Sequence, residues 1–573
     1  MSKIKLNQEE IKNIEVFLQN RFRELDDMRS EFDDLIEEEI NIYNDKDKYM
    51  EEKAEWEEKI TVPYIYTIVQ TIVARLIESF FSTDNYIKVF PEDDSLFDQE
   101  DRIRHWIQNK LDGLKFKYRA RDFFEDSLIQ RTIWLALRPV MDEKDEFKQV
   151  DFDVIKWFDF WFDTTAKDVE DTDIFVRKII KTSKLEVKVG GQNVYFNTDR
   201  VLKDTSIPDD IRDKKRKEYE AKHNVSKYYD VVNLSPTQKV ELLEWYGEYK
   251  IDGEYKNVIF TIANRKILVR AETNDLKTDK KKLFFPIRPI QQANSLIGKS
   301  IPQLIKKQQY ELNEIRSLRM QNLKTQVKLL FKYKKNAGID FDELFAKGGN
   351  AIAYEDLPTD IDLFVVPNMV QITSYISSEL IQDMQQVTGA VDYLMGTSAA
   401  RGATETASGI RQITEQALFK FGMMAKNLSG DILDFIKYVI ILTLKYNSKN
   451  ELLNNTDIAS FLKQSEKEIE YNYKFDLSIS DLSMRRDVER AQFINAINII
   501  GGLMAQTGGN MKNLLREVMK KLKMENIEKI LEAPQAEGGG ILESMNQQRG
   551  GSAQISPQAN GGAVPEEEAL QGL

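Results

Sequence analysis

The stretch that decides the fold runs from Ile301 to Thr325 and reads IPQLIKKQQYELNEIRSLRMQNLKT. Its apolar side chains recur at helical spacing, and Pro302 stands where the first turn of a helix tolerates proline. No glycine and no further proline follows, so we predict one continuous helix of about 37 Å. The predicted apolar stripe consists of Leu304, Ile305, Tyr310, Leu312, Ile315, Leu318 and Leu323.

The same stretch belongs to a strip of positive charge in an acidic chain. Between Lys299 and Lys335, ten basic residues are opposed only by Glu311 and Glu314, a local balance of +8 against a net charge of −13 for the chain. A concentrated basic strip on an acidic protein is typical of a surface that meets a polyanion. A solvated helix face and pairing with acidic faces of neighbouring subunits are the alternatives.

Downstream of this helix the pattern changes to short strands and then returns to a helix. Segments 327–333, 351–354 and 363–366 are β-prone and are separated by turn residues. A second helix is predicted over 370–388, and Gly389 is a suitable C-terminal stop for it.

A loop of small and polar residues follows the second helix. Residues 396–409 read GTSAARGATETASG and contain no side chain that builds a core, so we predict an exposed loop. A third helix is expected from about residue 403 or 408 to 446. Because it is long and rich in apolar side chains, it is predicted to pack centrally.

The residues before Ile301 divide into helices followed by strands, so the predicted fold class is α+β and helix-rich. Helices are expected over 6–46, 65–81, 97–114 and 118–132. Segments with strand character are 134–141, 149–162, 240–251, 255–263, 266–272 and 284–289, and 174–183 is a strand or a short helix. Asp252-Gly253 predicts a hairpin turn. The aromatic residues between Trp157 and Phe162 are predicted to be core.

Composition excludes several kinds of site. The chain of 573 residues has no cysteine, which excludes disulfides and thiolate metal sites, and its two histidines, His105 and His223, are far apart in sequence. No signal peptide is apparent, and the longest aliphatic run is too short to span a membrane. We therefore expect a soluble protein without a cofactor and without enzymatic activity.

One motif resembles a nucleotide-binding loop. Residues 293–300, ANSLIGKS, fit a permissive P-loop pattern, but prolines interrupt the preceding strand and no strand ending in an acidic residue follows. The simpler interpretation is a glycine turn that leads into the basic helix. A P-loop NTPase, a nuclease that uses some of the 94 acidic residues, and a helical scaffold protein remain as alternative functions.

The order of these elements resembles that of portal proteins of tailed bacteriophages, the head-to-tail connectors, and is podovirus-like. The resemblance is carried by the sequence GKSIP at 298–302, by Gln308, Gln309 and Asn313, and by residues 399–417. It implies a division into the following segments: 1–297 wing, 298–325 first stem helix, 326–369 clip, 370–388 second stem helix, 389–409 tunnel loop, 410–483 wing, 484–533 helical crown and 534–573 disordered tail.

The resemblance also implies a function and partners. These are a ring of twelve copies at one capsid vertex, a channel for packaging and ejection of double-stranded DNA without base recognition, and docking of the large terminase subunit and later of a head-to-tail adaptor. The ring would nucleate procapsid assembly with the major capsid and scaffold proteins. It would act in the virion and, during assembly, in the host cytoplasm.

Three groups of residues follow as candidates. Lys306, Lys307, Arg316, Arg319, Lys324 and Arg401 are expected near DNA, where backbone electrostatics suffice. The candidate tunnel loop residues are Thr397, Ser398, Arg401, Gly402, Thr404 and Glu405. The candidate docking surface of the clip is Lys332, Lys334, Lys335, Asp340, Asp342 and Glu343.

Overall fold

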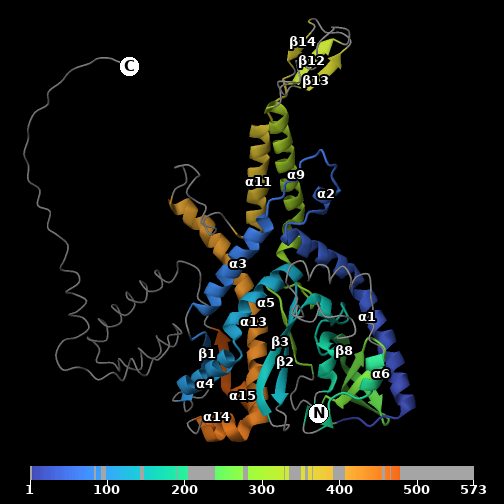
Figure 1. Ribbon diagram of the computed structural model, residues 1–573. Coiled ribbons are helices and arrows are strands. Elements are labelled where there is room, and N and C mark those ends of the chain that lie inside the picture. Colours follow the sequence, from blue (N-terminus) through green and yellow to red (C-terminus); the bar gives the residue numbers. More distant parts are fainter. Residues whose placement is uncertain are drawn as a thin grey trace, which may run out of the picture. The chain divides into compact units, whose positions relative to one another are not determined.

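The structure is a computed structural model of the chain (Figure 1). It describes residues 3–82, 85–91, 99–141, 147–186, 188–189, 192–203, 239–274, 282–327, 330–334, 350–354, 359, 361–363, 365–390, 407–454, 458–464 and 466–477. All of these residues belong to one compact unit, residues 1–488. The predicted crown, the tail and most of the predicted tunnel loop lie outside the described residues.

Five helices open the chain, and the four long helices predicted there are all present. α1 (Gln8–Tyr43) begins with a capping box, in which Asn7 Oδ1 accepts from the Glu10 amide at 2.8 Å and Glu10 Oε2 accepts from the Asn7 amide at 2.7 Å. The helices that follow are α2 (Lys48–Glu52), α3 (Tyr64–Phe81), α4 (Glu100–Gly113) and α5 (Phe116–Gln130). The apolar side of α3 is buried from Ile65 to Phe81.

Two antiparallel sheets form the body, in the orders β10-β9-β8-β5-β4 and β11-β2-β3. Their strands are β2 (Ile133–Met141), β3 (Phe147–Ile155), β4 (Phe160–Trp161), β5 (Ile174–Lys181), β8 (Lys239–Ile251), β9 (Glu254–Ala263), β10 (Ile267–Thr273) and β11 (Phe284–Ile287). As predicted, Asp252 and Gly253 form the hairpin turn, with φ of 54° and 87°. The mixed helix and sheet content confirms the α+β class.

Short elements complete the body. They are η2 (Trp157–Asp159), η3 (Thr182–Glu186), β6 (Lys188–Val189), β7 (Gln192–Asn193) and α6 (Thr198–Lys203). The aromatic residues of 157–162 are core, as expected. Trp157 is buried, and Phe160 stacks on Trp134 with ring centroids 4.3 Å apart.

α9 (Ile301–Val327) and α11 (Val370–Thr388) lie side by side as an antiparallel hairpin (Figure 1). A small sheet is inserted between them in the chain. Its central strand, β12 (Leu330–Lys334), is parallel to β13 (Asn350–Tyr354) and antiparallel to β14 (Ile361–Leu363). α11 has the predicted bounds because Gly389, at φ 81°, supplies the left-handed cap.

The third long helix, α13 (Ala407–Asn454), crosses the main core, which confirms the predicted central packing. Its inward side chains, among them Phe421, Leu428 and Phe435, are fully buried. α14 (Ala459–Leu462) and α15 (Glu466–Asn472) then lead into β15 (Tyr473–Leu477). β15 pairs antiparallel with β1 (Ile87–Pro91), so the end of the described chain pairs with the strand that follows α3.

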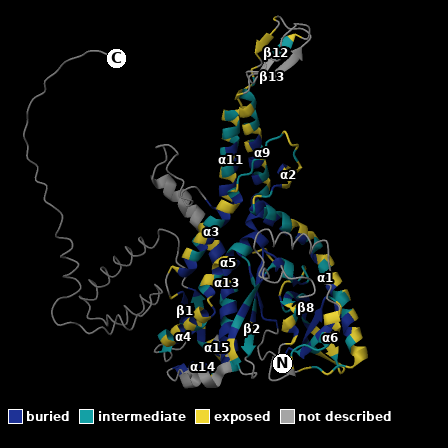
Figure 2. Cartoon of the chain, viewed as in Figure 1, coloured by how far each residue is buried: buried dark blue, intermediate teal, exposed yellow. Residues whose placement is uncertain are grey.

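The predicted apolar stripe of α9 is buried over only part of its length. The predicted apolar stripe is buried at Ile305 and Leu312, but Leu318 and Leu323 are 47% and 36% exposed. The first half of α9 packs on the body, whereas the side chains of its second half are mostly exposed or intermediate (Figure 2). The stripe therefore changes from core to surface along one helix.

Candidate assembly and DNA-facing surface

The start of α9 is fixed by a buried polar cluster. Ser300 Oγ accepts from the Gln303 amide at 3.0 Å, as a helix N-cap does, and donates to Glu39 Oε2 at 2.7 Å. Arg131 Nε donates to the same Glu39 oxygen at 3.0 Å. These hydrogen bonds hold the segment between β11 and α9 to α1 and to the end of α5.

The P-loop-like residues before α9 use their amides internally. The Gly298 amide donates to Thr132 Oγ1 at 2.9 Å, and the Lys299 amide donates to the Ile290 carbonyl at 2.8 Å. A Cβ on Gly298 would lie 2.7 Å from the Arg131 carbonyl oxygen. A phosphate-binding loop directs its amides at the phosphate. This loop instead serves as a tight turn against the body.

A row of buried polar side chains on α9 holds residues 60–65, which lead into α3 and form its first residues. Gln309, Asn313 and Ser317 are spaced four residues apart and are nearly fully buried. Their oxygens accept from three main-chain amides, those of Ile60 (3.0 Å), Val62 (3.0 Å) and Ile65 (3.2 Å). Asn313 Nδ2 also donates to Asp47 Oδ2 at 2.8 Å. From the sequence, Gln309 and Asn313 were identified only as part of the family resemblance. The spacing of three polar residues at i, i+4 and i+8 could have indicated a polar contact along one side of α9.

Arg319 joins the two helices of the hairpin. Its guanidinium donates to Thr373 Oγ1 at 3.1 Å, to the Thr373 carbonyl at 2.5 Å and to Ser377 Oγ at 2.6 Å. Partial burial and the neighbouring charge of Arg316 lower the pKa of Arg319. Arg319, a member of the candidate DNA-facing set, therefore forms its hydrogen bonds within the chain. These bonds fix the register of α9 against α11.

Two lysines of the same set form ion pairs within the chain. Lys306 pairs with Glu38 of α1. Lys324 Nζ lies 2.6 Å from Glu58 Oε1, although 56% of the Lys324 side chain is exposed. A surface pair of the second kind contributes little to stability. The sequence shows a single basic strip, but acidic residues of an earlier segment neutralise part of it.

Lys307 and Arg316 differ from these residues. Both side chains are exposed, and among the described residues neither forms an ion pair. They are nine residues apart, so at 3.6 residues per turn they lie on opposite sides of α9. The basic strip is thereby divided into two separate exposed charges.

The remaining candidates are only partly described. Lys332 and Lys334 lie on β12, half-buried and exposed respectively. The other candidates lie outside the described residues: Thr397, Ser398, Arg401, Gly402, Thr404 and Glu405 of the predicted tunnel loop, and Lys335, Asp340, Asp342 and Glu343 of the predicted clip.

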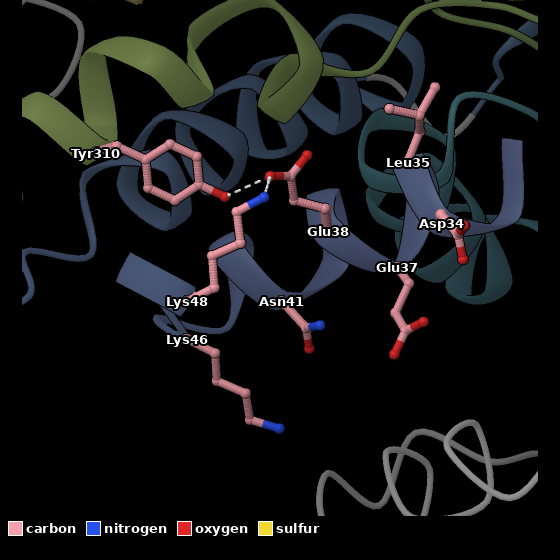
Figure 3. A pocket seen from close by; sticks show the side chains of 8 residues that line it. All are labelled: Asp34, Leu35, Glu37, Glu38, Asn41, Lys46, Lys48 and Tyr310. Carbon is pink, nitrogen blue, oxygen red and sulfur yellow. Dashed lines mark hydrogen bonds and ion pairs between the residues drawn. The ribbon is translucent and has the colours of Figure 1, made fainter. Parts of the chain in front are cut away.

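An open hollow of about 420 Å³ lies where α1 meets α9 (Figure 3). Glu38 lines this hollow. Its carboxylate accepts hydrogen bonds from Lys48 Nζ at 2.7 Å and from the Tyr310 hydroxyl at 3.1 Å. Burial raises the pKa of Glu38, but hydrogen bonds from Lys306 and Lys48 outweigh burial and lower it to about 2. The hollow is thus the outer side of an ion-pair network that holds α9 to α1.

Exposed apolar side chains gather on the hairpin. They are Leu318, Met320, Leu323 and Val327 of α9, Met369 directly before α11, and Ile372, Tyr375 and Val387 of α11. They lie on more than one side of the hairpin, and exposed apolar side chains in such number mark interaction surfaces. The sequence reasoning missed this surface because helical periodicity alone assigns apolar residues to a core.

The described residues hold no group of three or more acidic or histidine side chains placed to bind a metal ion. In the same part of the chain, no helix combines the length and the hydropathy that a membrane span needs. A basic and apolar helical hairpin anchored in an α+β body remains as the main surface feature.

A hairpin with charged and apolar side chains exposed in the isolated chain is typical of a protein that binds other protein surfaces in an assembly. The model of the family described as Phage SU10 portal protein matches residues 137–569, which is most of the chain. The chain belongs to this family and is a portal protein of a bacteriophage, the head-tail connector that acts in genome packaging. The family implies an oligomeric ring at a capsid vertex, with capsid and terminase partners. Among curated proteins, none matches the sequence.

Proposed function

We propose that twelve copies of this chain form a closed ring at one capsid vertex and that double-stranded DNA passes through its central channel during packaging and ejection. The single observation that supports this most is the hairpin of α9 and α11, which carries the small sheet β12–β14 in a chain of the portal family. Contacts between different surfaces of identical subunits close into rings when the rotation allows it.

The proposal gives each segment a part. The body with α13 is the wing, α9 and α11 are the stem, the β12–β14 sheet belongs to the clip, and residues 389–409 form the tunnel loop. Residues 484–533 are the crown and 534–573 the tail. The ring nucleates procapsid assembly with the major capsid and scaffold proteins. The portal itself hydrolyses nothing, and the terminase supplies the force for packaging.

The clip is the proposed docking surface for the large terminase subunit and afterwards for the head-to-tail adaptor. Its charged candidates combine Lys332, Lys334 and Lys335 with Asp340, Asp342 and Glu343. Mixed charges at the rim of an interface affect association rate and partner choice more than affinity. A clip that binds first the terminase and then the adaptor needs a contact that selects its partner without holding it permanently.

For the channel, we propose that Lys307 and Arg401 meet the DNA backbone, while Lys306, Arg319 and Lys324 act within the chain. The support is the internal pairing of the last three and the exposure of Lys307. A channel through which DNA slides needs few cationic contacts, because each phosphate contact adds affinity and slows movement.

The ring is tested by imaging the purified protein at high concentration by negative-stain microscopy together with native mass spectrometry. We expect rings with a central hole and a mass of about 800 kDa for twelve chains of 66.6 kDa. A species that stays monomeric at every concentration and also with scaffold protein would overturn the proposal.

The DNA contact is tested by comparing Lys307→Gln with Lys306→Gln in procapsids that package DNA in vitro. Lys307→Gln should change the packaging rate or DNA retention while the rings remain intact. Lys306→Gln, the matched control on the same turn of α9, should change stability instead. Unchanged packaging by the Lys307→Gln variant would contradict the assignment of that residue.

A further inference from the structure

The second half of α9 carries an exposed stripe, here called the basic stripe, which consists of Arg316, Met320, Leu323 and Val327. The spacings of four, three and four residues place all of them on one side of the helix. Met320, Leu323 and Val327 are 39%, 36% and 83% exposed. Arg316 supplies a positive charge at one end of this apolar surface.

α11 carries a second exposed stripe, here called the acidic stripe, which consists of Ile372, Tyr375, Glu379 and Asp383. The spacings of three, four and four residues again place them on one side. Ile372 and Tyr375 are 56% and 71% exposed. Glu379 and Asp383 are exposed and have no ion pair among the described residues. Two apolar side chains are thus followed by two negative charges.

Arg319 fixes how the two stripes relate. It contacts Thr373 and Ser377, so those side chains mark the sides on which the helices face each other. Successive residues of a helix are turned by about 100° around its axis. Around the axis of α9, the basic stripe therefore lies about a quarter of a circle from the side that faces α11. The acidic stripe is turned about a third of a circle from the facing side of α11. Because the helices are antiparallel, these turns place the stripes on opposite sides of the hairpin.

The same contacts set the heights of the stripes. With Arg319 level with Thr373 to Ser377 in an antiparallel pair, Arg316 lies within about one turn of Glu379 along the hairpin. By the same register, Leu323 lies within about one turn of Ile372. The basic and acidic stripes therefore run in matching order, although they face away from each other within one chain.

We propose that the basic stripe of one copy packs against the acidic stripe of the next copy, with Arg316 facing Glu379 and Leu323 facing Ile372. This inference rests on the proposed ring. Rotation about an axis along the hairpin keeps every residue at its height, so matching heights on opposite sides are what a closed ring requires. The contact is heterologous, since it joins two different surfaces.

A second copy of this chain is the occupant that the charges favour. Arg316 and Glu379 are opposite in sign, and the apolar members of the stripes lie on the same side of these charges in both. A polyanion such as DNA would be repelled by Glu379 and Asp383 and would gain nothing from Ile372 or Tyr375. A self-complementary dimer contact would pair each stripe with its own copy and would leave Arg316 and Glu379 without each other.

Because the chain has no cysteine, the contact can be tested by site-directed cross-linking. The variant with Leu323→Cys and Ile372→Cys is treated with a short bis-maleimide and run on a denaturing gel. We expect a ladder of covalent oligomers that rises to the full ring, because every copy donates one thiol to each neighbour. Either substitution alone should give no ladder.

The matched control replaces Leu318, which lies on the other side of α9, together with Ile372. Leu318→Cys with Ile372→Cys should not give the ladder. Rings seen by native mass spectrometry without a ladder from the Leu323 and Ile372 pair would overturn this inference and leave the proposed ring intact. Monomers at every concentration, with and without scaffold protein, would overturn both.

Charge exchange provides an independent measurement. Arg316→Glu or Glu379→Arg should raise the protein concentration at which half of the chains are in rings by about tenfold or more, and the double exchange should restore it. Glu311→Lys, a charge reversal at an exposed position of α9 outside the basic stripe, should change that concentration by less than about twofold. Circular dichroism melting of each variant identifies misfolding. A folded Arg316→Glu variant that assembles like the parent would contradict the pairing.

Discussion

Arg131 donates to Glu39 at 3.0 Å, and only 5% and 0% of these two side chains are exposed. The same carboxylate accepts from Ser300, the residue that caps α9. One buried acid on α1 thereby joins the end of α5 to the start of the hairpin. This group is therefore one of the connections between the hairpin and the body, beside the contacts of Glu38 and Asn313.

Glu39→Ala should lower the free energy of unfolding by about 3–5 kcal/mol, because it leaves the Arg131 guanidinium buried without its partner. Urea or thermal unfolding followed by circular dichroism measures the loss. Glu31→Ala, an exposed position on the same helix, should change stability by less than about 0.5 kcal/mol. Equal effects of the two substitutions would contradict the assigned role of Glu39.

Stability should fall in acid partly through Glu38. Its pKa of about 2 in the folded chain lies below the ordinary value of 4.5, so its contribution is complete above pH 4.5 and is lost as the pH falls towards 2. Glu38→Gln should cost about 1–2 kcal/mol at pH 7 and give a flatter stability curve between pH 4.5 and 2. Unfolding curves at several pH values measure both, with Glu37→Gln as the control. An unchanged slope would argue against the network.

Asn313→Ala should loosen residues 60–65, at the start of α3. The Val62 amide loses its acceptor and Asp47 loses a donor, which should cost about 1–3 kcal/mol. Hydrogen exchange should show faster exchange at residues 60–65, with little change in the sheets of the body. Asn322→Ala, further along α9, is the matched control. Full protection of 60–65 in the Asn313 variant would show that other contacts hold the segment.

Gly298→Ala and Lys299→Ala should separate the two interpretations of the P-loop-like motif. The added methyl group would lie 2.7 Å from the Arg131 carbonyl oxygen, so Gly298→Ala should cost about 1–3 kcal/mol. Lys299 is exposed, and its replacement should leave the melting temperature unchanged. Calorimetry measures both variants. ATP turnover by the parent chain that Lys299→Ala abolishes would restore the nucleotide-binding interpretation.

The elements that the sequence predicts well are those with local causes. The bounds of α11 follow from Gly389, because a left-handed cap favours glycine. The turn at Asp252-Gly253 is equally local. In both cases the residues that decide the conformation lie within a few positions of the element that they end.

What the sequence did not predict depends on segments far apart in the chain. The partner of Lys306 is Glu38, 268 residues earlier, and no spacing within α9 points to it. The pairing of Ile87 with Leu477 in β1 and β15 is equally remote. The exposure of Leu323 depends on where the body stops covering α9, which helical periodicity does not encode. The helix and the strand that carry the described candidate residues were predicted from the sequence, while the partners of their charges came only from the fold.

The row of Gln309, Asn313 and Ser317 grips the main chain of residues 60–65 rather than its side chains. Every amino acid except proline offers the same amide, so these hydrogen bonds place no demand on the side chain of Thr61, whereas they require the side chains of the three residues on α9. A saturation mutagenesis library should therefore tolerate most replacements at Thr61 and few at Asn313. Two surfaces in contact would then diverge at different rates in related phages.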